Sequence, residues 1–142
     1  MNNDKKIIVS ACMAGVNCKY DGGNNNNSKI IKLLKAEKIV LICPEELGGM
    51  STPRIPSEIV NDKVIAKNGV DVTYEFNKGA LEALKIAKSV NADTAILQQR
   101  SPSCASKMIY DGTFTGRLVK GQGITTKLFE ENGIKVLTID DI

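Results

Sequence analysis

Residues 39–45 read Ile-Val-Leu-Ile-Cys-Pro-Glu, and this stretch decides the fold that the rest of the chain is expected to adopt. Four aliphatic residues in succession predict a strand that is buried on both faces, as in a parallel sheet. Pro44 lacks a backbone N–H and fixes φ, so the strand is predicted to end at Cys43. The Cys43 thiol and the Glu45 carboxylate therefore lie together at a strand end, which is where open α/β sheets bind ligands.

The segments on either side of this strand alternate between strands and helices. A strand is predicted at Lys6–Ala11, and a helix runs from Ser28 as its N-cap to about Lys38. The later elements are a β-hairpin formed by 59–60 and 64–66, a helix from Thr73 as N-cap to about Val90, a strand at 94–97, a helix at 124–131 and a strand at 135–139. Residues 24–27, four asparagines, are expected to be a surface loop, and the segment 110–116 is rich in turn residues. The pattern predicts one α/β domain over residues 1–142: a mostly parallel, Rossmann-like sheet flanked by helices, with a small β-hairpin insertion.

The composition narrows the range of functions. The chain has 142 residues, a formal net charge of +3 and lysines spread along its length, so its attraction for anions is modest. Aromatic residues make up 4% and tryptophan is absent, which gives little support to a platform for stacking RNA bases. The chain has no histidine, which excludes Ser-His and Cys-His catalytic pairs and metal sites that use histidine.

The N-terminal residues have no signal-peptide pattern, and no apolar run approaches the length of about 20 residues that a membrane span needs. We therefore expect a cytoplasmic protein without a membrane segment. In that compartment the four cysteines are expected to be reduced thiols, metal ligands or redox groups rather than disulfides.

Three of the cysteines follow predicted strands. Cys12 lies just past the first strand, Cys43 ends the second, and Cys104 lies one loop past the third. If these strands are parallel, their carboxyl ends bring the three thiols to one edge of the sheet. Thiolates are soft ligands that favour zinc, copper(I) or iron–sulfur clusters. Cys18 could complete a structural zinc site, but its spacing from Cys12 fits zinc pairs poorly; cysteines that only pack are the remaining alternative.

Several polar residues stand beside these thiols. Glu45 is placed to move protons in a site that has no histidine. Ser101 and Ser103 flank a tight loop before Cys104 and can donate hydrogen bonds to a substrate or to sulfur. Arg54 lies between two prolines and is a rigidly presented cation, which could hold an anion or a carbonyl, or pair with a surface acid.

Five motifs in order carry a resemblance to a known family: Ser-Ala-Cys-Met-Ala-Gly-Val-Asn-Cys-Lys-Tyr-Asp-Gly at 10–22, Cys-Pro-Glu-Glu-Leu-Gly-Gly at 43–49, Thr-Pro-Arg at 52–54, Arg-Ser-Pro-Ser-Cys at 100–104 and Tyr-Asp-Gly-Thr-Phe-Thr-Gly at 110–116. With these motifs the chain resembles the thiouracil desulfidases, long catalogued only as a small bacterial domain of unknown function. Relatives fused to another domain remove sulfur from 4-thiouridine in tRNA. The resemblance covers nearly the whole chain.

The resemblance implies a 4Fe-4S cluster held by Cys12, Cys43 and Cys104, with one iron left open for the thiocarbonyl sulfur of the substrate. It also implies that Glu45 and Ser101 assist the attack of water on the carbon. The reaction is non-redox: thiouracil and water give uracil and sulfide. Cys18 matches a position that is not a cluster ligand in the family.

The predicted partner is a small thiolated pyrimidine of the 2- or 4-thiouracil type, contacted by Arg54, Ser103 and Tyr20; RNA is a less favoured partner. Two departures from the family pattern lie beside the site and could change the choice of substrate. Ala105 stands where a glycine is expected, and Gln98-Gln99 stand where a Lys-Glu pair is common. The alternatives are a structural or sensor module that binds zinc or a cluster through all four cysteines, and a small-molecule- or nucleotide-binding α/β domain whose cysteines only pack.

Overall fold

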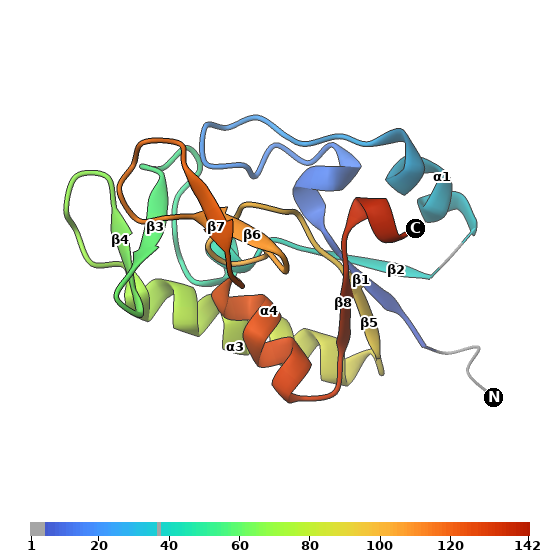
Figure 1. Ribbon diagram of the computed structural model, residues 1–142. Coiled ribbons are helices and arrows are strands. Elements are labelled where there is room, and N and C mark those ends of the chain that lie inside the picture. Colours follow the sequence, from blue (N-terminus) through green and yellow to red (C-terminus); the bar gives the residue numbers. More distant parts are fainter. Residues whose placement is uncertain (1–4, 37) are drawn as a thin grey trace.

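The computed structural model describes residues 5–36 and 38–142, and a four-stranded parallel sheet lies at its centre (Figure 1). The strands are β1 (Ile7–Ser10), β2 (Ile39–Ile42), β5 (Thr94–Ile96) and β8 (Lys135–Leu137). They stand in the order β2-β1-β5-β8, and every neighbouring pair is parallel. The predicted α/β class is therefore confirmed. From β1 the chain passes to β2 on one side, and the later strands β5 and β8 are added on the other side. A ligand-binding crevice is expected where this direction changes, at the carboxyl ends of β1 and β5.

Helices cover both faces of this sheet. Helices α3 (Thr73–Ser89) and α4 (Ile124–Glu131) pack on one face, and α1 (Ser28–Ala36) packs on the other (Figure 1). Successive β1 residues alternate between the two faces, because side chains alternate along a strand. Ile8 joins the core beneath α3 and α4, and Val9 joins the core beneath α1; both are fully buried.

The predicted β-hairpin is present as β3 (Ser57–Val60) and β4 (Lys63–Ala66), paired antiparallel. Its two-residue turn is Asn61-Asp62, and both residues have positive φ, as a type I′ turn requires. The hairpin packs against the start of α3 through Val64 and Phe76. The insertion is therefore anchored on the helix that covers one face of the sheet.

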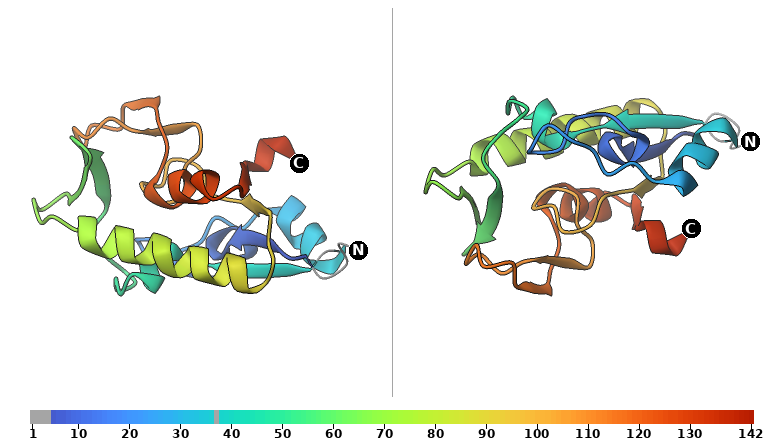
Figure 2. Two further views of the ribbon diagram at one scale, coloured as in Figure 1. Left: turned by 90° about the horizontal axis from the view of Figure 1, so that it is seen from below. Right: turned by 90° about the horizontal axis from the view of Figure 1, so that it is seen from above.

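A second antiparallel hairpin was not predicted. Strands β6 (Met108–Tyr110) and β7 (Leu118–Lys120) flank the segment that is rich in turn residues. Three-residue strands are too short to show an alternating pattern. Glu58 joins the two hairpins, because its Oε1 accepts the backbone N–H groups of Gly112 and Phe114. Figure 2 shows both hairpins at the end of the molecule opposite the N-terminus.

The prediction that the 39–42 strand is buried on both faces was wrong. Strand β2 is an edge of the sheet, and Leu41 is 38% exposed; of its residues only Ile42 is buried. A run of aliphatic residues looks the same in a central strand and in an edge strand whose faces are partly covered. The strands that are buried on both faces are the two central ones, β1 and β5.

The helix starts lie within one residue of their predicted positions. The cap of α1 is Asn27 rather than Ser28, since the Asn27 Oδ1 accepts the Lys29 N–H at 2.9 Å. Helix α3 begins at Thr73 itself, and its N-cap is Val72. Among residues 5–36 and 38–142, no helix has the length and the apolar character that crossing a membrane requires.

Candidate functional site

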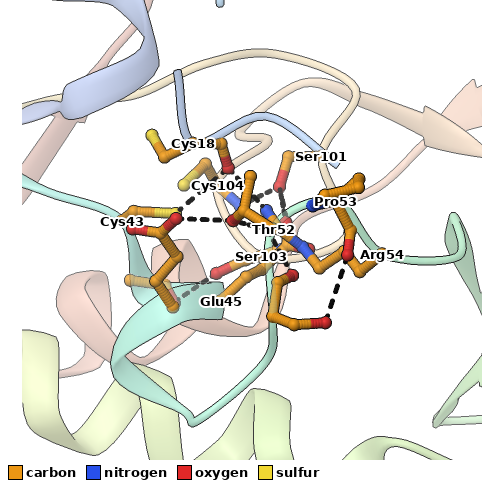
Figure 3. Close-up of polar contacts among 12 residues, drawn as sticks. Cys18, Cys43, Glu45, Thr52, Pro53, Arg54, Ser101, Ser103 and Cys104 are labelled. Atoms are coloured by element: carbon orange, nitrogen blue, oxygen red, sulfur yellow. Dashed lines mark hydrogen bonds and ion pairs between the residues drawn. The ribbon is translucent and has the colours of Figure 1, made fainter. Parts of the chain in front are cut away.

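The loops that follow β1, β2 and β5 bring the predicted thiols together. Cys12 lies in the 3-10 turn after β1, Cys43 is the N-cap of a short helix after β2, and Cys104 lies in the loop after β5. The Cys18 thiol interacts with both Cys12 and Cys43, and Cys104 interacts electrostatically with the same two groups. Figure 3 shows three of these cysteines, Cys18, Cys43 and Cys104, together with the neighbouring Glu45, Arg54 and Ser101. Parallel strands therefore gather all four cysteines at one edge of the sheet.

Hydrogen bonds divide these thiols into two kinds. The hydrogen bond from Cys18, with a further one from the Asn25 amide, lowers the pKa of Cys12 to about 7 although burial opposes this. The hydrogen bond from Cys18 also lowers the pKa of Cys43, helped by a backbone N–H and by the charge of Arg54. The pKa of Cys18 is raised, chiefly because its thiol must keep its proton to hydrogen-bond with Cys12 and Cys43. These pKa shifts favour the thiolate form of Cys12 and Cys43 and the thiol form of Cys18.

Cys104 differs because it is buried. Desolvation raises the pKa of Cys104 to about 12, and a hydrogen bond from the Ser10 hydroxyl opposes this rise. Ligation of a metal requires a thiolate, so binding at Cys104 releases a proton.

The donor set fits an iron–sulfur cluster. Three thiols arrive from three separate loops, and soft sulfur donors are what such clusters take. The described part of the chain holds no group of three or more Cys, Asp or Glu side chains placed to bind one metal ion. A 4Fe-4S cubane places each cysteine on a different iron, so its ligands need not converge on a single point.

Glu45 is presented by a short helix that the sequence did not predict. Helix α2 (Pro44–Leu47) begins at Pro44, because a proline is tolerated at the first helical position. The helix lies directly against α3: a Cβ at Gly48 would stand 2.0 Å from the Glu75 carbonyl oxygen, and one at Gly79 would stand 1.9 Å from the Pro44 oxygen. The two helices can approach this closely because Gly48 and Gly79 have no Cβ. This close packing fixes the backbone that carries Glu45.

Arg54 binds the protein through each of its guanidinium nitrogens. Its Nε donates to Glu45 Oε1 at 3.0 Å, its Nη2 to the Cys18 carbonyl at 2.8 Å, and its Nη1 to the Ser51 carbonyl at 3.1 Å and to Thr52 Oγ1 at 2.7 Å. Burial disfavours its charge, but the attraction and the hydrogen bond to Glu45, together with the charges of Cys43 and Glu46, outweigh burial and raise the pKa of Arg54. The acid that Arg54 pairs with is therefore in the site, and the guanidinium holds it in place.

The Ser101 hydroxyl is oriented toward Glu45. Its oxygen accepts the N–H groups of Ser103 and Cys104, each at 3.0 Å, so its proton is left to donate. The Glu45 Oε2 lies 3.5 Å from this oxygen. Ser103 points elsewhere: it is 1% exposed, and its Oγ lies 2.7 Å from Thr125 Oγ1 on α4.

Tyr20 lies at the surface, 41% exposed, with the Lys19 Nζ 5.7 Å from the centre of its ring. Its carbonyl accepts the Arg54 N–H at 2.7 Å. The backbone of Tyr20 thus supports Arg54, and its ring is exposed at the surface beside Lys19.

The family follows from comparison with known proteins. The model of the 2-thiouracil desulfurase family matches residues 7–141. This chain belongs to the 2-thiouracil desulfurase family. The family predicted from the five motifs is thereby confirmed.

Two relatives of this desulfurase-family chain cover nearly its whole length. The uncharacterized protein YbbK of Bacillus subtilis (strain 168) is 40% identical over 146 residues, which are 96% of this chain and 97% of that protein. The solved structure of the 4Fe-4S-dependent thiouracil desulfidase TudS matches with a TM-score of 0.92 at 38% identity, over 97% of this chain and 93% of that one.

Sequence reasoning missed several supports of this desulfurase-family site. Asn25 was assigned to a surface loop, yet its Nδ2 donates to the Cys12 sulfur at 3.4 Å and its N–H to the Cys12 carbonyl at 2.9 Å. Thr126 Oγ1 donates to the Cys104 carbonyl at 2.7 Å. No spacing rule marks either contact. The one available signal was the position of the asparagine run directly after the loop that carries Cys12 and Cys18.

The two departures from the family pattern also lie in this region. Ala105 is fully buried, and the Gln98 N–H donates to Ser10 Oγ at 2.9 Å. The Gln99 side chain donates to Ser106 Oγ at 3.0 Å and accepts the Lys107 N–H at 3.1 Å. These residues shape the loop that carries Cys104.

Proposed function

We propose that this protein is a 4Fe-4S-dependent, non-redox desulfidase that converts a small thiolated pyrimidine, of the 2- or 4-thiouracil type, into uracil and sulfide. The observation that carries the proposal is the placement of Glu45. One of its oxygens is held by Arg54, and the other faces the Ser101 hydroxyl. The Cys12 thiol lies close enough to interact electrostatically with the Glu45 carboxylate. Membership of the 2-thiouracil desulfurase family supports the substrate class.

Cys12, Cys43 and Cys104 would hold the cluster. When bound, the cluster would supply an iron without a protein ligand, which takes up the thiocarbonyl sulfur. The lowered pKa values of Cys12 and Cys43 favour the thiolate form that a ligand needs, and Thr126 of α4 holds the loop of Cys104 through its carbonyl. Reduced thiols are needed throughout, so we place the protein in the cytoplasm.

Glu45 serves as the proton acceptor in the attack of water. The water oxygen bonds to the thiocarbonyl carbon, the C–S bond breaks, and the two protons of water leave with the sulfur as hydrogen sulfide. The carboxylate carries one of these protons from water to sulfur, and Ser101 orients the water through its hydroxyl. No electron is gained or lost, so the reaction needs no reductant.

The remaining predicted residues take other tasks. The guanidinium of Arg54 is used by Glu45 and three loop groups, so Arg54 orients the acid and does not hold the substrate directly. Ser103 secures the loop against α4. The exposed ring of Tyr20 contacts the substrate at the rim.

Anaerobic reconstitution tests this proposal. We expect about four iron and four sulfide per chain, broad visible absorbance, and conversion of 2-thiouracil or 4-thiouracil to uracil with stoichiometric sulfide, followed by chromatography. Cys43→Ala should lose the iron. A reconstituted protein that carries the cluster but releases no sulfide from either base would refute the desulfidase activity. One zinc per chain that is lost in Cys18→Ala would instead support the structural module.

A further inference from the structure

Asn25 belongs to the run of four asparagines, and the proposed desulfidase gives this residue no task. Its side-chain Nδ2 donates to the Cys12 sulfur at 3.4 Å, and its backbone N–H donates to the Cys12 carbonyl at 2.9 Å. One residue therefore holds the same proposed cluster ligand twice, at its backbone and at its sulfur.

An amide is a donor that does not titrate. A ligand sulfur carries negative charge and accepts hydrogen bonds, so the nitrogen of the Asn25 amide must face it, because the amide oxygen can only accept. The donor is therefore present at every pH at which the protein is folded. The contact depends on the position of the Asn25 side chain and on no protonation equilibrium.

The neighbouring asparagines hold this amide in place. The Asn27 N–H donates to the Met13 carbonyl at 3.0 Å, so the segment 24–27 lies along the 3-10 turn that follows β1. At the other end of the segment, the Asn24 Nδ2 donates to Asn17 Oδ1 at 2.9 Å. The segment is thus tied at both ends to the loop of the proposed ligand, and these ties do not involve the side chain between them.

We propose that Asn25 is a positioning residue of the cluster site, whose amide N–H donates to the sulfur of the ligand Cys12 and raises the reduction potential of the bound cluster. The inference rests on the proposed function, because it takes Cys12 as a cluster ligand. A hydrogen bond donated to a ligand sulfur withdraws negative charge from it and stabilises the more negative, more reduced state of the cluster. The proposed reaction transfers no electron, so the cluster works in one charge state, and this donor opposes the loss of an electron from it.

Two variants of nearly the same size as asparagine test the donor. Asn25→Leu keeps the branched shape without a donor, and Asn25→Asp replaces the donor by a negative charge. Each protein is reconstituted anaerobically, and iron per chain and the reduction potential are measured at neutral pH, the potential by following visible absorbance against the applied voltage. We expect both variants to keep the iron content of the wild type. The potential should fall in Asn25→Leu and should fall further in Asn25→Asp, because the carboxylate adds negative charge beside the sulfur.

A matched control lies in the same run of asparagines. Asn26→Leu makes the same change at an exposed neighbour and should leave the potential at the wild-type value. An unchanged potential in Asn25→Leu would overturn the inference. An equal fall in Asn26→Leu would overturn it as well, since the effect would then belong to the whole segment and not to the Asn25 amide.

Iron analysis separates the remaining outcomes. Cys12→Ala should lose the iron, because it removes a ligand. Loss of iron from both Asn25 variants would overturn the inference, because Asn25 would then be required for assembly of the cluster and would not tune an assembled one. A wild-type chain that assembles no cluster would overturn the proposed function together with this inference, and that failure is recognised before any variant is compared.

Discussion

Arg54 and Glu45 form an ion pair in which Nε lies 3.0 Å from Oε1, and their side chains are only 5% and 18% exposed. The pair is shielded from solvent, and Arg54 is itself braced by the Cys18 carbonyl and by Thr52. One carboxylate oxygen is thereby fixed, and the other is directed toward Ser101. The position of the proposed proton acceptor thus depends on Arg54.

Replacing Arg54 by lysine should lower activity without loss of the cluster. A lysine keeps the charge but cannot reproduce the planar fork that binds Glu45, Thr52 and the Cys18 carbonyl. We expect kcat to fall by about 10- to 100-fold, which corresponds to about 1.4–2.8 kcal/mol. Iron content should stay at the wild-type value. Arg117→Lys, on an exposed arginine of the β6–β7 loop, serves as the control.

The split between kcat and KM distinguishes this role from a direct contact. If Arg54→Lys raised KM and left kcat intact, the guanidinium would bind the substrate directly. This was one of the two roles that the sequence left open for Arg54. A loss carried by kcat supports the orienting role.

Glu45→Gln should abolish turnover and spare the cluster. The amide keeps the shape of the side chain but cannot accept a proton from water, and a positioned general base contributes about 100-fold or more. Ser101→Ala should cost less, because it removes the orienting hydroxyl and leaves the acceptor. Iron analysis and steady-state kinetics check both variants. Glu82→Gln, on the surface of α3, is the matched control; an active Glu45→Gln would exclude Glu45 as the base.

The convergence of the thiols could be predicted from the sequence because parallel strands deliver their carboxyl ends to one edge. The aliphatic runs at 7–9, 39–42 and 95–97 marked the strands, and Cys12, Cys43 and Cys104 follow them. Local periodicity and chain direction were enough for this step.

The supports of the site could not be predicted in the same way. The bond from Asn25 to the Cys12 sulfur and the bond from Arg54 to Glu45 depend on how separate loops dock, and no periodicity encodes docking. Strand order likewise depends on how separate segments dock. The edge position of β2 and its exposed Leu41 were therefore not predicted.

Gly79→Ala should destabilise the fold, contrary to the usual effect of this change in a helix. Alanine is ordinarily favoured over glycine in a helix interior by about 1 kcal/mol. Here the added Cβ would stand 1.9 Å from the Pro44 oxygen and would push α2 away from α3. We expect a loss of about 1–3 kcal/mol in the free energy of unfolding, together with reduced turnover as Glu45 moves. Denaturant unfolding checks this, with exposed Lys78→Ala as control; a stabilised Gly79→Ala would contradict the close packing.

In the cluster-free protein, Cys12 should be the cysteine that alkylates at the lowest pH. Its pKa is lowered to about 7, so the thiol is protonated and slow below pH 7 and becomes a reactive thiolate above it. Cys104, with a pKa raised to about 12, should stay unreactive through neutral pH. Iodoacetamide labelling resolved by peptide mass spectrometry measures both. Asn25→Ala should move the Cys12 midpoint upward, and Asn24→Ala should not; equal midpoints in all three proteins would refute the role of the Asn25 amide.

The contact between Ser103 and Thr125 should show strong coupling in a double-mutant cycle. The two hydroxyls lie 2.7 Å apart and are buried, so removing either one leaves the other without its partner. Ser103→Ala and Thr125→Val should each cost about 1–3 kcal/mol of unfolding free energy, and the double variant should cost clearly less than their sum. Each single variant should also retain less iron after reconstitution, because this contact anchors the loop that carries Cys104, and the double variant should recover part of it. Exposed Thr115→Val should change stability by no more than about 0.5 kcal/mol. Strictly additive costs would mean that Ser103 is free of α4 in solution, and would return it to the residues available for contacting the substrate.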